Sequence, residues 1–458
     1  MNLLRIKPKI FKKERTYKNP LRVIAIGFSV VILTGSFLLM LPISSKSGTV
    51  TPFVQCLFTA TSATCVTGLA VVDTYLHWSL FGQLVIISMI QIGGLGFMLM
   101  LTAFSILVGR KITMRERLLI GKSLSVDSLS GIVKLSKKII FGTFFLEFMG
   151  GIILSVRFIR DFGVAEGIRK GFFHSISAFC NAGFDLMGEL GEFAGLVPYQ
   201  GDFAVTLTIS LLIILGGLGF YVWDDVLTSR HVRRYTLHTK IVLVTTAFLL
   251  LSGTAFYMAA EWNNPETMAG KNIAEKFMLS FFQSTSTRTA GFSQIDQAAF
   301  TPASKAVTMM LMFIGGSPGS TAGGVKTVSM AILILTAIST LRGRNEIFAY
   351  GRRVPYTYII DAITVVIVGV SCVLFGTFCL SMIDGVDFET ALFECVSAFA
   401  TVGLSENLTP LLSSPSLLVL IGLMYMGRVG IITLGLAILV RNRVRPTVKH
   451  PEGKIIVG

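Results

Sequence analysis

Four glycines recur at nearly constant spacing, each in a segment that could bind a cation through its backbone. Gly68, Gly183, Gly291 and Gly403 lie between 108 and 115 residues apart. Glycine reaches backbone conformations that other residues avoid, so it can turn consecutive carbonyl oxygens to one side. Such oxygens can replace the hydration shell of a monovalent cation. With their uncharged neighbours, the predicted cation-binding filter residues are Val66, Thr67, Gly68, Asn181, Ala182, Gly183, Thr289, Ala290, Gly291, Thr401, Val402 and Gly403.

Each glycine belongs to a common frame, Phe-x-x-x-(Ser/Thr)-(Ala/Ser)-x-x-x-x-Gly-(Phe/Leu), over residues 58–69, 173–184, 281–292 and 393–404. A single glycine of this kind would most simply end a helix. Four in register favour four equivalent pore loops. A glycine pair follows three of the copies, and the fourth has Gly427-Arg428 in its place. The pairs are Gly93-Gly94, Gly216-Gly217 and Gly315-Gly316.

The composition places these segments in a membrane. The 458 residues are 52% hydrophobic and only 14% charged, with a mean hydropathy of +0.73, whereas globular proteins carry about 25% charged residues. A run of about 18 apolar residues is typical of a membrane-spanning helix. The eight candidate spans cover residues 23–41, 80–108, 139–156, 203–222, 241–260, 306–340, 362–383 and 417–440.

Between the spans of each pair lies a half-hydrophobic segment of roughly ten residues, too short to cross about 30 Å of hydrocarbon. A short helix that stops inside the membrane and returns as a loop fits this length, provided that the loop lines a cavity. The carboxyl ends of four such helices would present partial negative charge to a central cation. We therefore predict an all-α integral membrane fold with four tandem helix–pore-loop–helix repeats around one pore. The predicted units are a cytosolic tail (1–20), repeat 1 (21–131), repeat 2 (132–236), repeat 3 (237–350) and repeat 4 with the carboxyl-terminal tail (351–458).

The net charge of +15 could suggest nucleic acid, but its distribution argues against that partner. The Lys and Arg residues cluster in loops that alternate with the spans, as the positive-inside rule requires. The pattern predicts a multi-pass protein of the cell membrane, surrounded by lipid, with both termini in the cytosol. The basic loops could also dock a cytosolic partner, and this alternative stays open. The clusters cover residues 5–22, 110–138, 230–240, 342–353 and 441–454.

The second span of the third repeat is interrupted by polar, glycine-rich sequence. Proline removes an amide and clashes with the preceding turn, and irregular backbone at this depth must line the cavity. We interpret the segment as a gate below the filter. Arg428 takes the place of a glycine in the fourth repeat, so it either points at the axis or pairs with a neighbouring helix. The predicted gate comprises Gly315, Gly316, Ser317, Pro318, Gly319, Ser320, Thr321, Ala322, Gly323, Gly324, Lys326 and Arg428.

Two other ionisable residues inside apolar segments are interpreted as structural. Arg288, in the third filter segment, is predicted to face away from the pore and pair with Glu394 or another outer acid. Glu147 is predicted to bond a neighbouring helix rather than an ion. No nucleophile or acid–base cluster indicates an enzyme.

The motifs resemble those of the Trk/Ktr/HKT superfamily of potassium transporters, and most closely the bacterial Ktr-type membrane subunit. The similar residues are 63–69, 181–184, 287–292, 315–327, 400–404 and 427–428. The resemblance implies a potassium channel-like fold in one polypeptide, with four repeats in place of four subunits and K⁺ bound at the filter carbonyls. A homodimer of such pores is implied as well. It also implies docking on a cytosolic ring of nucleotide-binding subunits that respond to ATP and ADP, and no bound cofactor other than the transported K⁺. Sodium-selective relatives have a serine at the first filter glycine, which here is Gly68. Activation by Na⁺ occurs in Ktr systems, but no residue here indicates it.

Two alternatives to a potassium uptake pore remain open. A sodium or poorly selective cation pore could share the same architecture. An alternating-access carrier would need inverted repeats with discontinuous helices in corresponding positions, whereas these repeats run in parallel.

Overall fold

The computed structural model describes residues 20–108, 112–123, 131–229, 231–344, 346–431 and 433–435. The predicted cytosolic tail 1–20 lies almost wholly outside these residues, as do the ends of the last predicted span and of the carboxyl-terminal tail. The helices are α1 (Pro20–Met40), α2 (Phe53–Cys65), α3 (Thr74–His77), α4 (Leu80–Leu95), α5 (Phe97–Leu107), α6 (Met114–Ser123), α7 (Ile132–Phe162), α8 (Val164–Phe179), α9 (Phe203–Leu218), α10 (Phe220–Thr228), α11 (Leu237–Ala260), α12 (Ile273–Ser286), α13 (Pro302–Phe313), α14 (Thr327–Leu341), α15 (Tyr356–Asp384), α16 (Phe388–Ala400) and α17 (Ser414–Val429).

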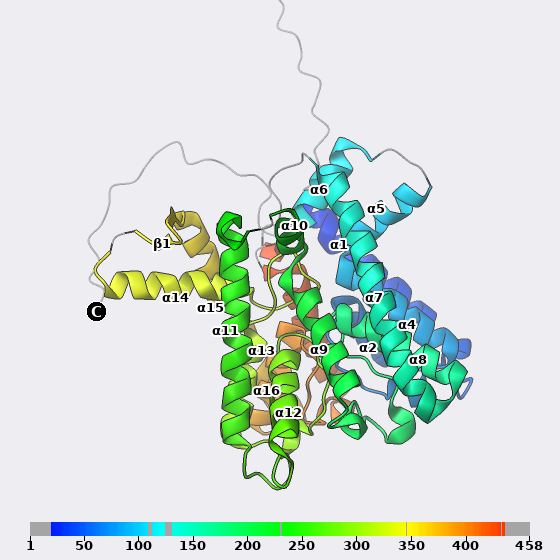
Figure 1. The fold of residues 1–458 in the computed structure, drawn as a ribbon. Helices are drawn as coiled ribbons and strands as arrows, with labels where there is room; N and C mark the ends of the chain where they lie inside the picture. Colours follow the sequence, from blue (N-terminus) through cyan, green and yellow to red (C-terminus); the bar gives the residue numbers. More distant parts are fainter. Residues whose placement is uncertain are drawn as a thin grey trace, which may run out of the picture.

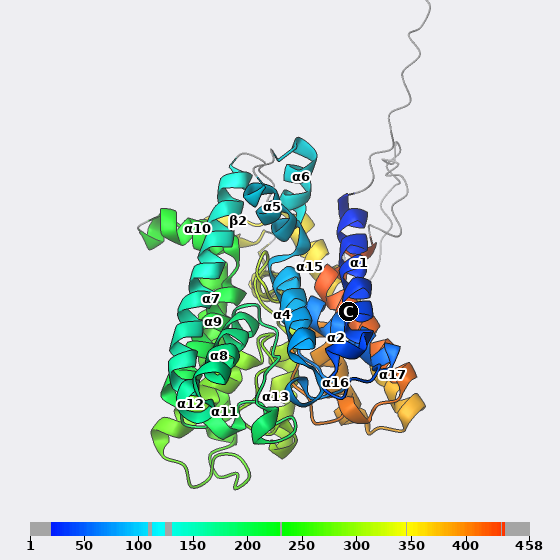
Figure 2. The same cartoon turned by 90° about the vertical axis from the view of Figure 1, so that its right-hand side faces the viewer.

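The fold repeats one unit four times, as predicted. In each unit a long helix (α1, α7, α11 or α15) packs on a shorter one (α2, α8, α12 or α16), and a third helix (α4, α9, α13 or α17) completes it. Two views at right angles show the long helices running roughly parallel around the short ones (Figures 1 and 2). The first and last repeats are in contact, because α2 packs against α17. The chain is therefore closed into a ring of four repeats around the four short helices.

Polar caps fix where several helices begin at one end of this bundle. The side chains of Ser79, Asp202, Asn272 and Thr301 accept hydrogen bonds from the first free backbone N–H groups of α4, α9, α12 and α13. Such caps satisfy donors that have no partner within the helix. The caps therefore set the register in which the short helices and third helices enter the apolar region.

Among the described residues, four helices are long and apolar enough to cross a membrane, or up to six if each bent pair counts as one span. The two bent pairs were each predicted as one continuous span. Instead α4 and α5 meet at about 100°, and α9 and α10 at 92°. The bends occur at Gly96 and Gly219, whose φ angles are +81° and +94°. These left-handed values end a right-handed helix, and glycine adopts them without the steric cost of a β-carbon.

The third repeat departs most from this pattern. Its α13 is followed by residues 314–326, hereafter the α13–α14 loop, and α14 then runs crosswise to α11 (Figure 1). Ile314 and Val325, at the two ends of the loop, form an isolated parallel bridge. A hairpin of β1 (Phe348–Ala349) and β2 (Arg352–Arg353) follows α14 and is the only sheet among the described residues. Apart from this hairpin, the regular elements of the described residues are helices, as predicted for an all-α fold.

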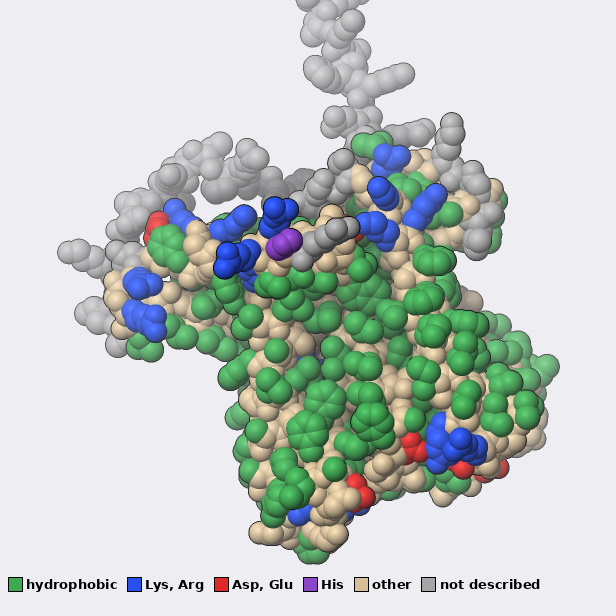
Figure 3. All heavy atoms as spheres, in the orientation of Figure 1, with side chains coloured by type: hydrophobic (Ala, Val, Ile, Leu, Met, Phe, Trp, Pro, Cys, Tyr) green, Lys and Arg blue, Asp and Glu red, His purple; other side chains and the backbone are tan. Residues whose placement is uncertain are grey.

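The surface divides into bands. In Figure 3 the middle of the visible face is mainly hydrophobic, while Lys and Arg side chains gather along the upper edge near α14, β1 and α6. Acidic side chains appear mainly at the lower end of this face (Figure 3). An apolar belt between two polar ends is the surface of a protein that spans a bilayer. The chain is a multi-pass membrane protein.

Candidate ion pathway

Two residues before each repeated glycine, the backbone adopts the same unusual left-handed conformation. Val66, Asn181, Thr289 and Thr401 have φ angles of +60°, +58°, +67° and +54°. The glycines that follow are also left-handed, with φ between +70° and +98°. Of these four non-glycine residues, only asparagine tolerates this region readily. All four loops therefore reach their repeated glycine with the same backbone geometry.

The four glycines form a closed ring, here called the glycine ring (Gly68, Gly183, Gly291 and Gly403). Each α-carbon approaches the carbonyl oxygen of the residue that precedes the next glycine. An added β-carbon would lie 2.1 to 2.7 Å from that oxygen in every case, closer than real β-carbons come. From such an added β-carbon, the distance would be 2.5 Å from Gly68 to Ala182 O, 2.7 Å from Gly183 to Ala290 O, 2.3 Å from Gly291 to Val402 O and 2.1 Å from Gly403 to Thr67 O. Only glycine therefore fits at each position, for steric as well as conformational reasons.

Serine side chains hold each loop to its own helix. Ser62 and Ser397 accept hydrogen bonds from the amides of Gly68 and Gly403, each at 3.1 Å. In the second repeat Ser177 donates instead to the carbonyl of Phe184 at 2.7 Å. In three repeats this serine occupies the predicted Ser/Thr position of the frame, which explains why the frame includes it.

The third repeat is shifted by one residue. Thr285 occupies the frame position, but its hydroxyl bonds back to Phe281 within the helix. Instead the hydroxyl of the next residue, Ser286, holds the loop to the helix by donating to the carbonyl of Phe292 at 2.5 Å. The frame alone does not single out Ser286, because α12 ends five residues before Gly291, whereas α2 and α16 each end three residues before their glycine.

A cavity of about 730 Å³ opens on one side of the glycine ring and reaches all four of its members. Its walls include the carboxylates of Asp185, Glu192 and Asp296. Burial raises the pKa of Asp185 to about 6, helped by the nearby Asp73. Hydrogen bonding by the Met187 amide opposes this rise. An acidic mouth of this kind concentrates cations at the ring.

The α13–α14 loop lies against the opposite side, bonded to the second repeat. The amides of Ser317 and Thr321 donate to the carbonyls of Gly217 and Gly216 at 3.0 and 3.2 Å. The loop also approaches two short-helix ends closely. A β-carbon on Gly315 would lie 3.2 Å from the Thr289 methyl group, and one on Gly323 would lie 2.1 Å from the Thr401 hydroxyl. The glycines of the loop thus let its backbone pack directly beneath the ring.

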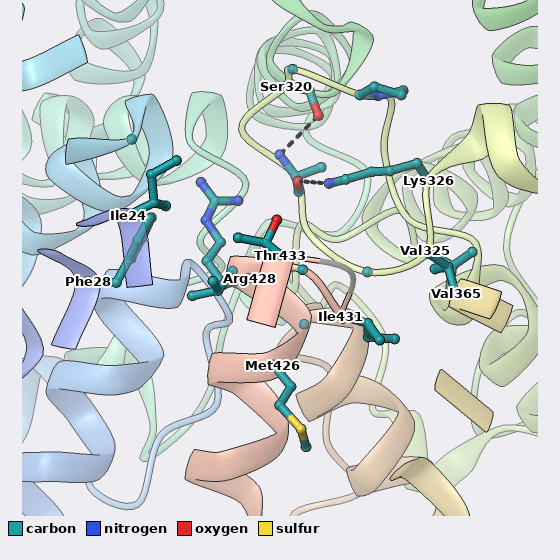
Figure 4. A pocket seen from close by; sticks show the side chains of 18 of the residues that line it. Ile24, Phe28, Ser320, Val325, Lys326, Val365, Met426, Arg428, Ile431 and Thr433 are labelled. Carbon is teal, nitrogen blue, oxygen red and sulfur yellow. Dashed lines mark hydrogen bonds between the residues drawn. The ribbon is translucent and has the colours of Figure 1, made fainter. Parts of the chain in front are cut away.

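Two cationic side chains line a second cavity, of about 350 Å³, on the loop side of the ring. The Arg428 guanidinium donates to the carbonyl of Thr321 in the loop and to those of Gly93 and Gly94 at the end of α4. The Lys326 ammonium donates to Ala322 O at 2.7 Å, within its own loop. Figure 4 shows Arg428 reaching from α17 toward the loop, with Ile24 and Phe28 of α1 beside it.

The arginine therefore joins three repeats. It starts in the fourth, bonds the loop of the third and bonds the glycine pair of the first. Of the two readings left open for Arg428, this geometry combines both, since the side chain lines the cavity and also bonds a neighbouring helix. The partners are backbone carbonyls rather than an acid.

The predictions for the two other ionisable residues in apolar segments, Arg288 and Glu147, have different outcomes. Glu394 bonds Ser405 and Thr409, and among the described residues no ion pair joins it to Arg288. That predicted pairing is wrong, because Arg288 lies in an apolar crevice between α9 and α11. Glu147 bonds the neighbouring helix α4, accepting two hydrogen bonds from Gln91 at 3.0 and 3.1 Å, as predicted for a structural role.

Comparison with known proteins identifies the family. Residues 3–443 match the model of the TrkH family, described as cation transport proteins. The chain belongs to the TrkH family. Its members transport cations and are not enzymes, as the lack of a catalytic cluster had indicated.

Several relatives match almost the whole length of this chain. The potassium/sodium uptake protein NtpJ of Enterococcus hirae is 40% identical over 98% of this chain and 99% of its own. The Ktr system potassium uptake protein B of Bacillus subtilis is 37% identical, with 99% of both chains covered. Among solved structures, the potassium transporter TrkH of Vibrio parahaemolyticus has a TM-score of 0.73 at 17% identity, covering 94% of this chain and 86% of that one. The predicted superfamily and the four-repeat fold are both confirmed.

Proposed function

We propose that this cation transport protein takes up potassium through the glycine ring. The observation that supports the proposal most directly is the closed succession of carbonyls, in which Thr67, Ala182, Ala290 and Val402 each face the glycine of the preceding repeat around the ring. Four repeats then present uncharged oxygen ligands to one axis. Carbonyl oxygens compensate the dehydration of a potassium ion, and the acidic outer cavity supplies ions to them.

None of the predicted filter residues has a charged side chain, and this supports quick release of the bound ion. Conduction requires binding strong enough for entry and weak enough for exit. Carbonyl dipoles, together with the carboxyl ends of α2, α8, α12 and α16, provide partial rather than full negative charge. The predicted filter residues fit this role through their backbones.

The proposed preference for potassium over sodium rests on the presence of glycine at all four positions of the ring. All four positions are glycine, and the named relatives transport potassium or potassium and sodium. The alternative function is a poorly selective or sodium-conducting pore of the same architecture. The Enterococcus hirae relative is named as a potassium/sodium uptake protein, which is consistent with this alternative.

The α13–α14 loop with Arg428 is proposed as the gate. A fixed cation beside the pathway repels K⁺, and the three hydrogen bonds of Arg428 hold the loop across the cavity. Opening would require Arg428 to exchange these carbonyls for other partners while the loop moves aside. The Lys326 ammonium adds a second positive charge to the same cavity.

The remaining assignments belong to the same proposal. The units 1–20, 21–131, 132–236, 237–350 and 351–458 act as tail and repeats. The basic edge in Figure 3 faces the cytosol, with both termini on that side. Because relatives carry the name of a Ktr system, we extend the proposal to a homodimer on a nucleotide-responsive cytosolic partner.

Uptake of ⁸⁶Rb⁺ into proteoliposomes containing the purified chain tests the function. Strong competition by K⁺ and weak competition by Na⁺ is the expected result. Equal competition would favour the poorly selective pore. A chain without residues 315–324 is measured in parallel, because a missing cytosolic partner could hold the gate closed. No uptake by either protein would contradict the pore and favour an alternating-access carrier.

A further inference from the structure

One side chain of the α13–α14 loop reaches the filter segments directly. The Thr321 hydroxyl lies 3.1 Å from the Oδ1 of Asn181 and 3.1 Å from the carbonyl of Phe179, at the end of α8. Both side chains are essentially inaccessible to solvent, with exposed fractions of 0% and 1%. A buried polar pair of this kind is costly to break, because each group would be left without a partner.

Asn181 is also hydrogen-bonded to the third repeat. Its Nδ2 donates to the carbonyl of Arg288 at 3.3 Å and to the Thr289 hydroxyl at 3.4 Å. Since a carbonyl can only accept, the nitrogen of the carboxamide must face Arg288, which turns the oxygen toward Thr321. A continuous hydrogen-bonded chain thus runs from the loop, through the second filter segment, to the third.

Thr321 also belongs to the proposed gate by its backbone. Its carbonyl accepts from Arg428 and its amide donates to Gly216 at 3.2 Å. Any movement that separates the loop from Arg428 and Gly216 must carry the hydroxyl away from Asn181. The space around the contact is closed, because a β-carbon on Gly216 would lie 2.8 Å from Asn181 Oδ1 and 2.9 Å from the Thr321 hydroxyl.

In the described part of the chain, the other three filter segments have no equivalent of the Thr321–Asn181 hydrogen bond. The residues equivalent to Asn181 are Val66, Thr289 and Thr401. Val66 has no polar side chain, and the Thr401 hydroxyl has no hydrogen-bond partner among the described residues. The loop packs closely against Thr289 and Thr401, where added β-carbons on Gly315 and Gly323 would meet their side chains, but among the described residues no hydrogen bond joins it to either side chain. Within the described part of the chain, Asn181 is thus the one filter residue whose side chain is hydrogen-bonded to the loop.

We propose that the Thr321–Asn181 hydrogen bond couples the gate to the filter, so that ion selectivity depends on the position of the α13–α14 loop. The proposal rests on the proposed function. Thr321 and Asn181 act as positioning residues: with the loop in place, Asn181 holds the second and third filter segments in register. When the loop moves away, the carboxamide loses its anchor and the two segments gain freedom to adapt to a smaller ion.

The first test replaces the hydroxyl by a methyl group of the same shape. Thr321→Val should lower the ratio of ⁸⁶Rb⁺ to ²²Na⁺ uptake in proteoliposomes by about two- to tenfold, the range expected for the loss of one buried hydrogen bond. Thr321→Ser should restore the wild-type ratio. The matched control is Thr254→Val, which removes a buried hydroxyl that bonds only its own helix at Leu250. A merely structural defect would reduce the uptake of both ions equally and leave the ratio unchanged.

The second test is a double-mutant cycle with Asn181→Gly. Glycine keeps the left-handed backbone at position 181 and removes the carboxamide, so the ratio should fall. Thr321→Val added to this variant should then have no further effect on the ratio. Additive effects, or a wild-type ratio in conducting Thr321→Val protein, would overturn the coupling while leaving the pore intact. No uptake by any of the proteins, including the Thr254→Val control and the chain lacking residues 315–324, would overturn the proposed function and the coupling with it.

Discussion

The carbonyl oxygen of Thr67 faces the α-carbon of Gly403, where an added β-carbon would lie only 2.1 Å away. These residues come from the first and the last repeat, more than 300 positions apart in the chain. Their contact closes the succession of four repeats into a ring. Because no side chain fits between neighbouring repeats at these glycines, the width of the ring is set by backbone atoms, which gives the rigidity that the proposed filter needs.

The Gly68→Ser variant should lose selectivity. A side chain there would clash with Ala182 O at 2.5 Å and would have to adopt a φ of +95°. Overpacking of this kind typically costs about 1–3 kcal/mol. We expect the ratio of Rb⁺ to Na⁺ uptake to fall by about tenfold, which corresponds to ~1.4 kcal/mol. Gly48→Ser is the control, because Gly48 has a similar φ of +68° but no neighbour within 4 Å. An unchanged ratio in Gly68→Ser would contradict the filter assignment.

Removing residues 315–324 should raise the flux of Rb⁺. The deletion rejoins Ile314 and Val325, which already lie side by side as a backbone bridge, so the flanking helices need not move far. The measurement is the initial rate of ⁸⁶Rb⁺ uptake per folded protein, judged by size-exclusion chromatography. A well-folded deletion variant with unaltered or lower flux would argue against the gate.

Arg428→Ala should also raise the flux, by a smaller factor than the deletion. The substitution removes a positive charge from the inner cavity and frees Thr321 O, Gly93 O and Gly94 O. Arg428→Lys keeps the charge but cannot make the same forked set of hydrogen bonds, so it separates the two effects. Flux near the wild-type level in Arg428→Lys and raised flux in Arg428→Ala would assign the barrier to charge. Lower flux in both variants would rule out a barrier at this residue.

Uptake should fall as the outer solution is acidified through about pH 6. The pKa of Asp185 is raised to about 6, chiefly by burial, so its carboxyl group is ionised at pH 7.5 and gains a proton by pH 5. The outer cavity then loses negative charge and attracts fewer cations, an effect that added salt should weaken. Asp185→Asn should give low uptake with little dependence on pH at limiting Rb⁺. Steep acid inhibition that persists in Asp185→Asn would assign the titration to another group.

Two glycines of α17 should respond in opposite ways to alanine. A β-carbon on Gly427 would lie 1.8 Å from the carbonyl of Phe399, whereas one on Gly422 meets nothing within 4 Å. Gly427→Ala should lower the melting temperature in detergent. Gly422→Ala should leave it unchanged or raise it, since alanine favours a helix by up to about 1 kcal/mol over glycine. Equal melting temperatures for the two variants would mean that α17 does not pack on the end of α16 in solution.

Much of this protein follows from its sequence alone. The period of the glycine frame determined that there are four repeats, and the length of the apolar runs determined that they lie in a membrane. Both are local properties of the chain, since a span needs only enough apolar residues and a left-handed loop needs its glycine. The same locality explains why the family could be identified from short motifs.

The tertiary structure decided what depends on residues far apart in the chain. It set the bends at Gly96 and Gly219, the shift from Thr285 to Ser286 and the carbonyl partners of Arg428. It also brought the Thr321 hydroxyl to the carboxamide of Asn181, 140 residues away. No sequence pattern encodes such pairs, because any of many buried donors could satisfy an acceptor. Only the packing of the four repeats brings one particular donor within hydrogen-bonding distance.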